Sequence, residues 1–200
     1  MPAPLHTLQT AGEAVQWLRT RVTGTLHTDS RQITPGDGFI AWPGAATDGR
    51  AHVADAMVRG ATACLVEQSG VEAFGFTGDH MAALHGLKGA TGPIAAQWFD
   101  HPTSQLAVLA VTGTNGKTST AWWLAGALNA LSNRELPALA GCALVGTLGM
   151  GVAPALESTG MTTPDPVRLQ RAFAQFAEAG HRACAIEASS IGLAEHRLDG

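Results

Sequence analysis

One glycine-rich segment constrains the fold of this chain more than any other feature. The apolar residues 106–111 lead into Gly113-Thr114-Asn115-Gly116-Lys117-Thr118-Ser119, and residues 117–131 have the composition of a helix. A strand, a glycine-rich turn and the first turn of a helix together direct backbone N–H groups at a phosphate. An apolar run of strand length predicts a parallel strand covered on both faces. The segment therefore predicts an α/β fold with a phosphate site at the carboxyl end of this strand.

The side chains of this phosphate loop suit a nucleotide with its magnesium ion. Gly113 and Gly116 allow a tight turn and a close approach of the backbone to phosphate. Lys117 can reach the β- and γ-phosphates, and the hydroxyl of Thr118 can ligate Mg²⁺. The loop is shorter than G-x-x-x-x-G-K-[ST], because Val111 occupies the first glycine position. The alternative is a chance Gly-Lys-Thr in an ordinary turn, which the flanking strand and helix disfavour.

The remaining pattern predicts two α/β units. Helices are expected over residues 11–21, 53–59, 94–99, 117–131 and 167–179, and strands over 39–42, 63–66, 106–111, 143–146 and 183–186. In the second half, strands and helices alternate, which predicts right-handed crossovers and a parallel sheet. We expect a small N-terminal domain over residues 1–88 and a second domain over 89–200.

Composition excludes several classes of protein. Hydrophobic residues make up 46% of the chain and charged residues 14%, which favours a compact enzyme over a disordered chain. A net charge of -4 gives no basic surface for nucleic acid. Cys64, Cys142 and Cys184 are far apart in the sequence, so we interpret them as small core residues in a reducing compartment. Residues 1–20 lack a signal pattern and no apolar run could span a bilayer, so we expect a cytoplasmic protein.

Residues 111–119 closely resemble the ATP loop of the Mur ligase family, and folylpolyglutamate synthetases share a similar loop. The resemblance implies amide ligation through an acyl phosphate. ATP phosphorylates a substrate carboxylate, an amine attacks it, and ADP and phosphate are released. It also implies that the loop binds ATP with Lys117 as a catalytic residue. The ATP-binding residues would be Thr114, Asn115, Gly116, Lys117, Thr118, Ser119 and Thr120.

Two segments before the loop extend the resemblance. Residues 28–41 are similar to the family's D-S-R-x-x-x-x-G-D-x-F-x-A segment, which lies in the domain that holds the uridine diphosphate end of the substrate. This implies that Thr28 and Ser30 line the uracil and ribose site. The alternative is that Asp29 and Ser30 only close a turn.

Residues 44–50 resemble the family's G-x-x-x-D-G-R loop, which contacts uracil and diphosphate. The matching positions are Ala45, Ala46 and Thr47, whose small side chains would leave contacts mainly to the backbone. Arg50 could pair with a phosphate or with Asp48, and the sequence leaves both open.

Residues 158–165 resemble the family's T-T-P loop, where two threonines bind the muramoyl-peptide substrate. The resemblance gives that role to Thr162 and Thr163. Asp165 and Pro166 also suit the start of a helix. The two interpretations use different residues, so both can hold.

Residues 185–193 resemble the family's E-x-S-S-x-x-L segment at the end of a strand. By this resemblance Glu187 holds Mg²⁺ beside the phosphate loop and Ser189 touches the substrate. A plain charge at a strand end is the alternative for Glu187. Glu195 and Arg197 match positions that contact substrate in relatives. Glu195 replaces the usual glutamine, and a carboxylate cannot donate the same hydrogen bonds.

The segments together favour the Mur ligase that adds the third peptide residue in peptidoglycan precursor synthesis. Its substrates would be ATP with Mg²⁺, UDP-N-acetylmuramoyl-L-alanyl-D-glutamate (the UDP-N-acetylmuramoyl-dipeptide) and a free amino acid, and we expect a monomer. meso-Diaminopimelate is favoured, with L-lysine left open. The family's central domain continues beyond the position of Gly200, so we expect these 200 residues to be inactive alone and to associate through an exposed sheet edge.

Other functions fit less well. A GTPase would carry N-K-x-D for guanine, which the sequence lacks, and a small-molecule kinase would have the full loop spacing. Folylpolyglutamate synthetase begins almost directly with its ATPase domain, so the two segments before the loop disfavour it. A non-catalytic fragment that binds the UDP-linked substrate stays open.

Overall fold

The computed structural model describes residues 5–45, 47–131 and 141–200 of the chain. The chain divides into two compact units, the first ending at Trp98 and including Asp199–Gly200, the second spanning Phe99–Leu198. The sequence suggested a boundary after residue 88. Helix α3 (Leu87–Trp98) spans the residues between that boundary and the end of the first unit at Trp98. It packs against helix α1 (Ala11–Arg19) of the first unit. The α/β class predicted from the sequence is confirmed.

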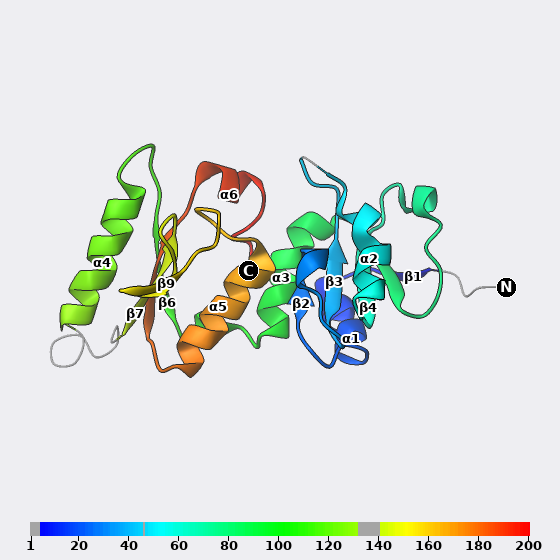
Figure 1. Cartoon of the computed structure of the whole chain (residues 1–200), viewed down its shortest axis with the longest axis horizontal. Helices are drawn as coiled ribbons and strands as arrows, with labels where there is room; N and C mark the ends of the chain where they lie inside the picture. Colours follow the sequence, from blue (N-terminus) through cyan, green and yellow to red (C-terminus); the bar gives the residue numbers. More distant parts are fainter. Residues whose placement is uncertain (1–4, 46, 132–140) are drawn as a thin grey trace. The chain divides into compact units, whose positions relative to one another are not determined.

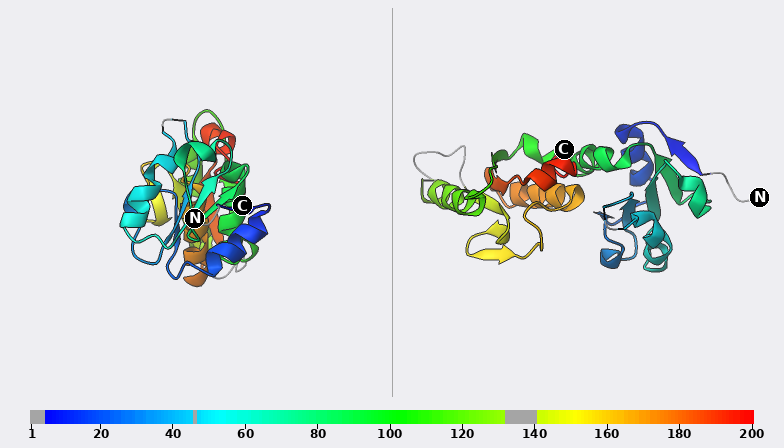
Figure 2. Two further views of the ribbon diagram at one scale, coloured as in Figure 1. Left: turned by 90° about the vertical axis from the view of Figure 1, so that its right-hand side faces the viewer. Right: turned by 90° about the horizontal axis from the view of Figure 1, so that it is seen from above.

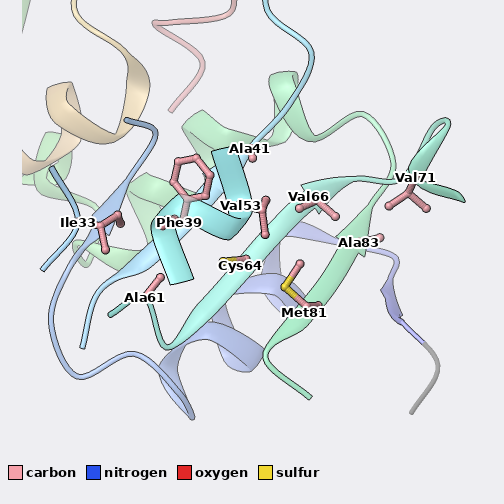
Figure 3. Close-up of a cluster of buried hydrophobic side chains, with 11 residues drawn as sticks. Ile33, Phe39, Ala41, Val53, Ala61, Cys64, Val66, Val71, Met81 and Ala83 are labelled. Carbon is pink, nitrogen blue, oxygen red and sulfur yellow. The ribbon is translucent and has the colours of Figure 1, made fainter. Parts of the chain in front are cut away.

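The first unit is built on a five-stranded parallel sheet with the order β1-β5-β4-β3-β2. Figure 1 labels β1, β2, β3 and β4. The strands are β1 (His6–Leu8), β2 (Leu26–His27), β3 (Gly38–Ala41), β4 (Ala63–Glu67) and β5 (Met81–Leu84). The other elements are helix α2 (Val53–Val58) and the 3₁₀ turns η1 (Ser30–Gln32), η2 (Gly49–His52) and η3 (Val71–Phe74). Figure 3 shows one core cluster, in which Phe39 of β3, Cys64 of β4 and Met81 of β5 pack with Val53 of α2.

Helix α3 begins where a buried carboxylate from the sheet caps it. Glu67 ends β4, and its Oε2 accepts the backbone N–H of Leu87 at 2.7 Å while Oε1 accepts that of Gly86 at 3.2 Å. Burial alone would raise the pKa of Glu67, but backbone hydrogen bonds from Ser69, Leu87 and Gly86 outweigh it and lower that pKa. The sequence predicted only residues 94–99 of this helix, because two glycines and Pro93 interrupt its pattern.

The second unit contains a five-stranded mixed sheet with the order β6-β10-β7-β8-β9. Strands β6 (Ala107–Val111), β10 (Ala183–Glu187) and β7 (Cys142–Gly146) are parallel. Strands β8 (Gly149–Val152) and β9 (Ala155–Glu157) form an antiparallel hairpin, yellow in Figure 2, which the sequence did not predict. The helices are α4 (Lys117–Leu131), α5 (Pro166–Glu178) and α6 (Ser190–Ala194), with a 3₁₀ turn, η4 (Pro102–Ser104).

Alternate residues of the central strands face two different helices. Ala143, Val145 and Ile186 pack with α5, while Leu144 and Ala185 pack with α4. Figure 1 shows α4 and α5 on opposite sides of this sheet. A strand covered on both faces is apolar at every position, which explains the continuous runs in β7 and β10. Asp165 caps the start of α5, because its carboxylate accepts the backbone N–H groups of Val167 and Arg168, so the predicted helix start is confirmed.

The prediction that residues 106–111 form a strand covered on both faces is wrong in its second part. Strand β6 is present, but Val108 is 38% exposed and Ala107 and Ala110 are exposed as well. Within the described residues β6 is an edge strand, because it pairs with β10 alone. The apolar run therefore predicts the strand correctly, but one face of the strand is not covered by other described residues.

All three cysteines are core residues, as predicted. Cys64 lies in β4, Cys142 in β7 and Cys184 in β10, and each is 0% exposed. Burial raises the pKa of the Cys64 thiol to about 12 and raises the pKa values of the other two thiols. Among the described residues, no helix is both long and apolar enough to cross a membrane.

Candidate functional site

The phosphate loop joins the end of β6 to the start of α4, as the sequence predicts. Gly113 and Gly116 have φ values of 141° and 78°, a backbone region that residues with a Cβ rarely adopt. Most of the segment is exposed, including Thr114, Asn115, Ser119 and Thr120. The N–H of Thr120 donates to the carbonyl of Gly116 at 2.9 Å, which begins the helix at the loop. The ammonium of Lys117 folds back on the loop and donates to the Gly113 carbonyl at 2.7 Å.

Glu187 lies beside this loop and is in contact with it. It ends β10 opposite Val111 of β6, and it is 2% exposed. Its Oε2 accepts a hydrogen bond from the hydroxyl of Thr118 at 2.9 Å. The phosphate-loop residue and the resemblance-derived glutamate, both expected to bind magnesium, are thus brought together, although 69 positions separate them in the sequence.

A third residue, Thr147, holds the same carboxylate and was not predicted. It follows β7, and its backbone N–H donates to Glu187 Oε1 at 2.8 Å. Its hydroxyl lies 3.3 Å from Glu187 Oε2 and 3.1 Å from Thr162 Oγ1. A Cβ at the preceding Gly146 would overlap the Glu187 carboxylate, so the carboxylate packs directly against that backbone. The one signal in the sequence was a hydroxyl directly after a predicted strand, at the same sheet edge as Glu187.

The T-T-P loop and the segment after β10 meet at this point. Thr163 is 1% exposed, and its hydroxyl donates to the Glu187 carbonyl at 2.8 Å and lies 3.0 Å from Ser189 Oγ. The guanidinium of Arg197 donates to the Thr163 carbonyl at 2.9 Å. The predicted residues therefore form one cluster. Because the Thr163 side chain is buried and engaged with protein atoms, it is better placed to orient the loop than to touch a ligand.

Three further predicted residues surround this cluster. Thr162 is half-buried and reaches Thr147, and Ser189 caps α6 by accepting the N–H of Gly192 at 3.0 Å. Glu195 lies at the C-cap of α6, two residues before Arg197. The role of Glu195 stays a prediction.

The residues present fit a magnesium ion shared with a nucleotide. The Thr118 hydroxyl and the Glu187 carboxylate supply hard oxygen donors of the kind Mg²⁺ prefers. In the described part of the chain, no group of three or more His, Cys, Asp and Glu side chains could hold a metal ion. Mg²⁺ commonly takes one or two protein ligands and completes its shell with phosphate oxygens and water. A site next to a phosphate loop suits that mode of binding.

The first unit carries a separate cavity of about 590 Å³. Its lining includes the predicted residues Thr28, Ser30 and Thr47, from the two N-terminal segments that resemble the family. Ala45 is exposed in the loop next to Gly44, which lines the cavity. Ala46 lies outside the described residues. Two segments that the sequence predicted to share one substrate thus border one cavity.

Asp29 closes a turn at this cavity, as its alternative interpretation proposed. Its carboxylate accepts the backbone N–H of Arg31 at 3.0 Å and also binds the Arg31 guanidinium. These side-chain hydrogen bonds from Arg31 lower the pKa of Asp29. Asp29, Ser30 and Arg31 all line the cavity, so the turn and a binding function are compatible.

The side chain of Arg50 is bound to other protein groups. It is 7% exposed, and its guanidinium binds the carboxylate of Asp48 at 2.8 Å. The same guanidinium donates to the carbonyls of Glu67 and Ser69, at 3.2 and 2.6 Å, and stacks over the ring of Phe74 at 4.6 Å. Of the two roles that the sequence left open, the structure shows the pairing with Asp48. The Arg50 guanidinium ties η2 to the end of β4.

Known proteins resemble this chain across nearly its whole length. Residues 111–200 match the Mur ligase middle domain. The UDP-N-acetylmuramoyl-L-alanyl-D-glutamate--2,6-diaminopimelate ligase of Acidovorax sp. (strain JS42) is 82% identical over 98% of this chain and 39% of its own length. The protein of the same name from Ectopseudomonas mendocina (strain ymp) is 42% identical over 99% of this chain and 38% of its own.

A solved structure of a ligase with that name shares the fold. It superposes with a TM-score of 0.65 at 28% identity, over 88% of this chain and 34% of that protein. The chain thus spans less than two fifths of the length of these curated relatives. The middle-domain match includes the phosphate loop and Glu187, and the closely similar relative covers both units. On these grounds residues 111–200 belong to the Mur ligase middle-domain family, and the chain as a whole is similar to the ligases named above.

Proposed function

We propose that this chain works within an ATP-dependent ligase of peptidoglycan precursor synthesis, which joins diaminopimelate to UDP-N-acetylmuramoyl-L-alanyl-D-glutamate. The observation that carries the proposal is the contact of Thr118 with Glu187 beside the phosphate loop, with the T-T-P loop adjoining it. The names of the relatives support the choice of diaminopimelate over L-lysine. A nucleotide-linked substrate and ATP favour a cytoplasmic location, and we expect a monomeric enzyme.

The proposed reaction has two steps. A carboxylate oxygen of the UDP-linked substrate attacks the γ-phosphorus of ATP, and the bond to the β-γ bridging oxygen breaks to release ADP. The amine of the incoming amino acid then attacks the carbonyl carbon of the acyl phosphate, loses a proton and displaces phosphate. Positioning and charge neutralisation dominate the catalysis of phosphoryl transfer.

The residues of the second unit have the chemistry for these tasks. Loop N–H groups and Lys117 would hold the phosphates, while Thr118 and Glu187 would hold Mg²⁺. The bound ion would neutralise charge on the transferred phosphoryl group. Thr162 and the Arg197 guanidinium, which lies against the T-T-P loop, would orient the acceptor carboxylate.

The cavity of the first unit is proposed to hold the uridine diphosphate end of the substrate. Thr28, Ser30 and Thr47 line it with hydroxyl and backbone groups, which suit hydrogen bonds to a nucleoside. Trp42 also lines the cavity and offers an aromatic face to a base.

Separate titrations of ADP and UDP test the two halves of this proposal. We expect the wild-type chain to bind both nucleotides in isothermal titration calorimetry. Lys117→Ala removes the loop cation and should weaken ADP binding about tenfold or more, because a charge-assisted contact to phosphate is lost. UDP binding should not change, since its proposed cavity lies in the other unit.

Lys88→Ala makes the same substitution on α3 and serves as the matched control. Wild-type ADP affinity in Lys117→Ala would contradict the assignment of the phosphate loop. UDP binding without any ADP binding by the wild-type chain would favour the alternative of a non-catalytic substrate-binding fragment.

A further inference from the structure

Thr147 makes three contacts within the candidate site, two with Glu187 and one with Thr162. Its backbone N–H donates to one oxygen of Glu187, its hydroxyl lies within hydrogen-bonding distance of the other, and the same hydroxyl meets Thr162 of the T-T-P loop. Thr147 is itself exposed, although the carboxylate it holds is 2% exposed. The residue therefore links a buried carboxylate to the surface on which ligands would bind.

The hydrogen bonds around Thr147 have a defined direction. An ionised carboxylate only accepts hydrogen bonds, and Glu187 is surrounded by donors from Thr118 and Thr147. The Thr147 hydroxyl must therefore give its proton to Glu187. A hydroxyl has one proton, so toward Thr162 the oxygen of Thr147 acts as the acceptor. Thr162 therefore donates to Thr147, and Thr147 donates to Glu187.

The two oxygens of Glu187 are held in different ways. Oε1 is fixed by a backbone N–H at 2.8 Å, which no side-chain substitution at position 147 removes. Oε2 receives the hydroxyls of Thr118 and Thr147, at 2.9 and 3.3 Å. Because Gly146 has no Cβ, the carboxylate can pack directly against the backbone of β7. The Thr147 hydroxyl therefore helps to set the direction of the oxygen that faces Thr118.

We propose that Thr147 is a positioning residue for the cation site, orienting Glu187 Oε2 toward Thr118 through a hydroxyl that Thr162 holds in place. This inference rests on the proposed function, because it requires that Thr118 and Glu187 share Mg²⁺. When Thr118 exchanges its contact with Glu187 for a cation, Thr147 keeps its two hydrogen bonds to the carboxylate. Glu187 then stays directed at the ion without help from the loop.

The test measures how much Mg²⁺ strengthens ADP binding, by calorimetry with ADP in EDTA and again in MgCl₂. Thr147→Val removes the hydroxyl and keeps the β-branched shape and the backbone N–H. We expect it to reduce the Mg²⁺-dependent gain in ADP affinity about tenfold, the effect of one hydrogen bond to a charged group. ADP binding in EDTA should stay within about twofold of the wild type, because the phosphate loop is intact. Thr147→Ser restores the hydroxyl and should restore the gain.

A double-mutant cycle tests the series arrangement. Thr162→Val should reduce the same gain by about threefold, because Thr147 loses the partner that orients its hydroxyl. The double variant should show no larger loss of this gain than Thr147→Val alone, since Thr162 reaches Glu187 only through Thr147. Thr103→Val is the matched control, an exposed threonine in η4 at the opposite end of β6.

The outcomes separate this inference from the function on which it rests. A wild-type gain in Thr147→Val, or a loss in Thr147→Ser as large as in Thr147→Val, overturns the role of Thr147 and leaves the phosphate loop standing. Additive effects of the two valine substitutions overturn the series arrangement. A wild-type chain that binds no ADP in either buffer contradicts both the proposed function and the inference. Thermal unfolding of each variant confirms that the exposed position tolerates the change.

Discussion

At the scale of single residues, buried carboxylates anchor both units through hydrogen bonds to loops. Asp37 is 3% exposed and lies in the Gly-Asp-Gly segment before β3. It accepts the N–H of Thr25 at 2.8 Å, the N–H and hydroxyl of Thr34 at 2.9 and 2.8 Å, and lies 3.3 Å from the imidazole of His27. The segment resembles a substrate-binding motif, and within it Asp37 is structural.

The hydrogen-bonded Asp37 carboxylate leads us to expect that the folded chain loses stability in acid. Burial alone would raise its pKa, but hydrogen bonds from Thr25 and Thr34 outweigh burial and hold the pKa below its usual value. A carboxyl with a lowered pKa in the folded chain stabilises the fold above its unfolded pKa of about 4. That contribution is lost as the pH falls through the lower folded pKa. We expect Asp37→Asn to reduce the free energy of unfolding at pH 7 by about 2–4 kcal/mol.

Urea unfolding between pH 7 and pH 3 measures this effect. The difference between the wild type and Asp37→Asn should shrink below about pH 4, where the wild-type carboxyl takes up its proton. Asp79→Asn changes an exposed aspartate of the same unit and is the control. A constant difference across the whole pH range would show that ionisation of Asp37 does not stabilise the fold.

At the scale of elements, the sequence predicted what depends on local pattern and missed what depends on distant partners. The runs in β7 and β10 and the periodic helix α5 were found within one or two residues. Strand β5 was missed because its residues lie in a stretch rich in glycine, and the β8–β9 hairpin because glycine interrupts its alternation. Thr118 and Glu187 were predicted through their motifs. Thr147 acquires its role only when β7 is placed beside β10.

Arg50 shows how one side chain joins elements. All three nitrogens of its guanidinium bind protein atoms, from Asp48 at the start of η2 to the carbonyls of Glu67 and Ser69. Arg50→Lys keeps the charge, but one ammonium cannot make the same set of planar contacts. We expect a loss of about 2–3 kcal/mol in the free energy of unfolding, with UDP affinity unchanged.

Chemical denaturation and a UDP titration on the same variant check this prediction. Arg182→Lys, an exposed arginine of the second unit, is the matched control and should change neither quantity. If UDP affinity falls while stability is kept, Arg50 contacts the ligand and its interpretation as a structural residue fails.

At the scale of the whole molecule, the open edge of the second sheet has the largest consequence. Strand β6 pairs only with β10 among the described residues, and Val108 exposes an apolar side chain there. Trp123 of helix α4 is another exposed apolar side chain of this unit, at 71%. An unpaired apolar edge strand is a template for pairing with another chain.

We expect the 200-residue chain to self-associate at high concentration and Val108→Lys to reduce that association, because a charged residue on an edge strand disfavours strand pairing. Sedimentation velocity over a range of concentrations measures this. Val58→Lys places the same charge at a valine that is 88% exposed on helix α2, so it adds charge without touching a sheet edge. Equal suppression by both variants would mean that net charge, and not the β6 edge, controls association.

The contacts of the phosphate loop also determine how a ligand has to enter it. Lys117 already donates to the Gly113 carbonyl, and Thr118 already donates to Glu187. A nucleotide therefore competes with internal partners for both side chains, and its measured affinity is the difference between two sets of contacts. Each internal contact that the loop gives up on binding therefore lowers the measured affinity of the nucleotide. The Gly113 carbonyl and the Glu187 carboxylate thus compete with a nucleotide for the side chains of Lys117 and Thr118.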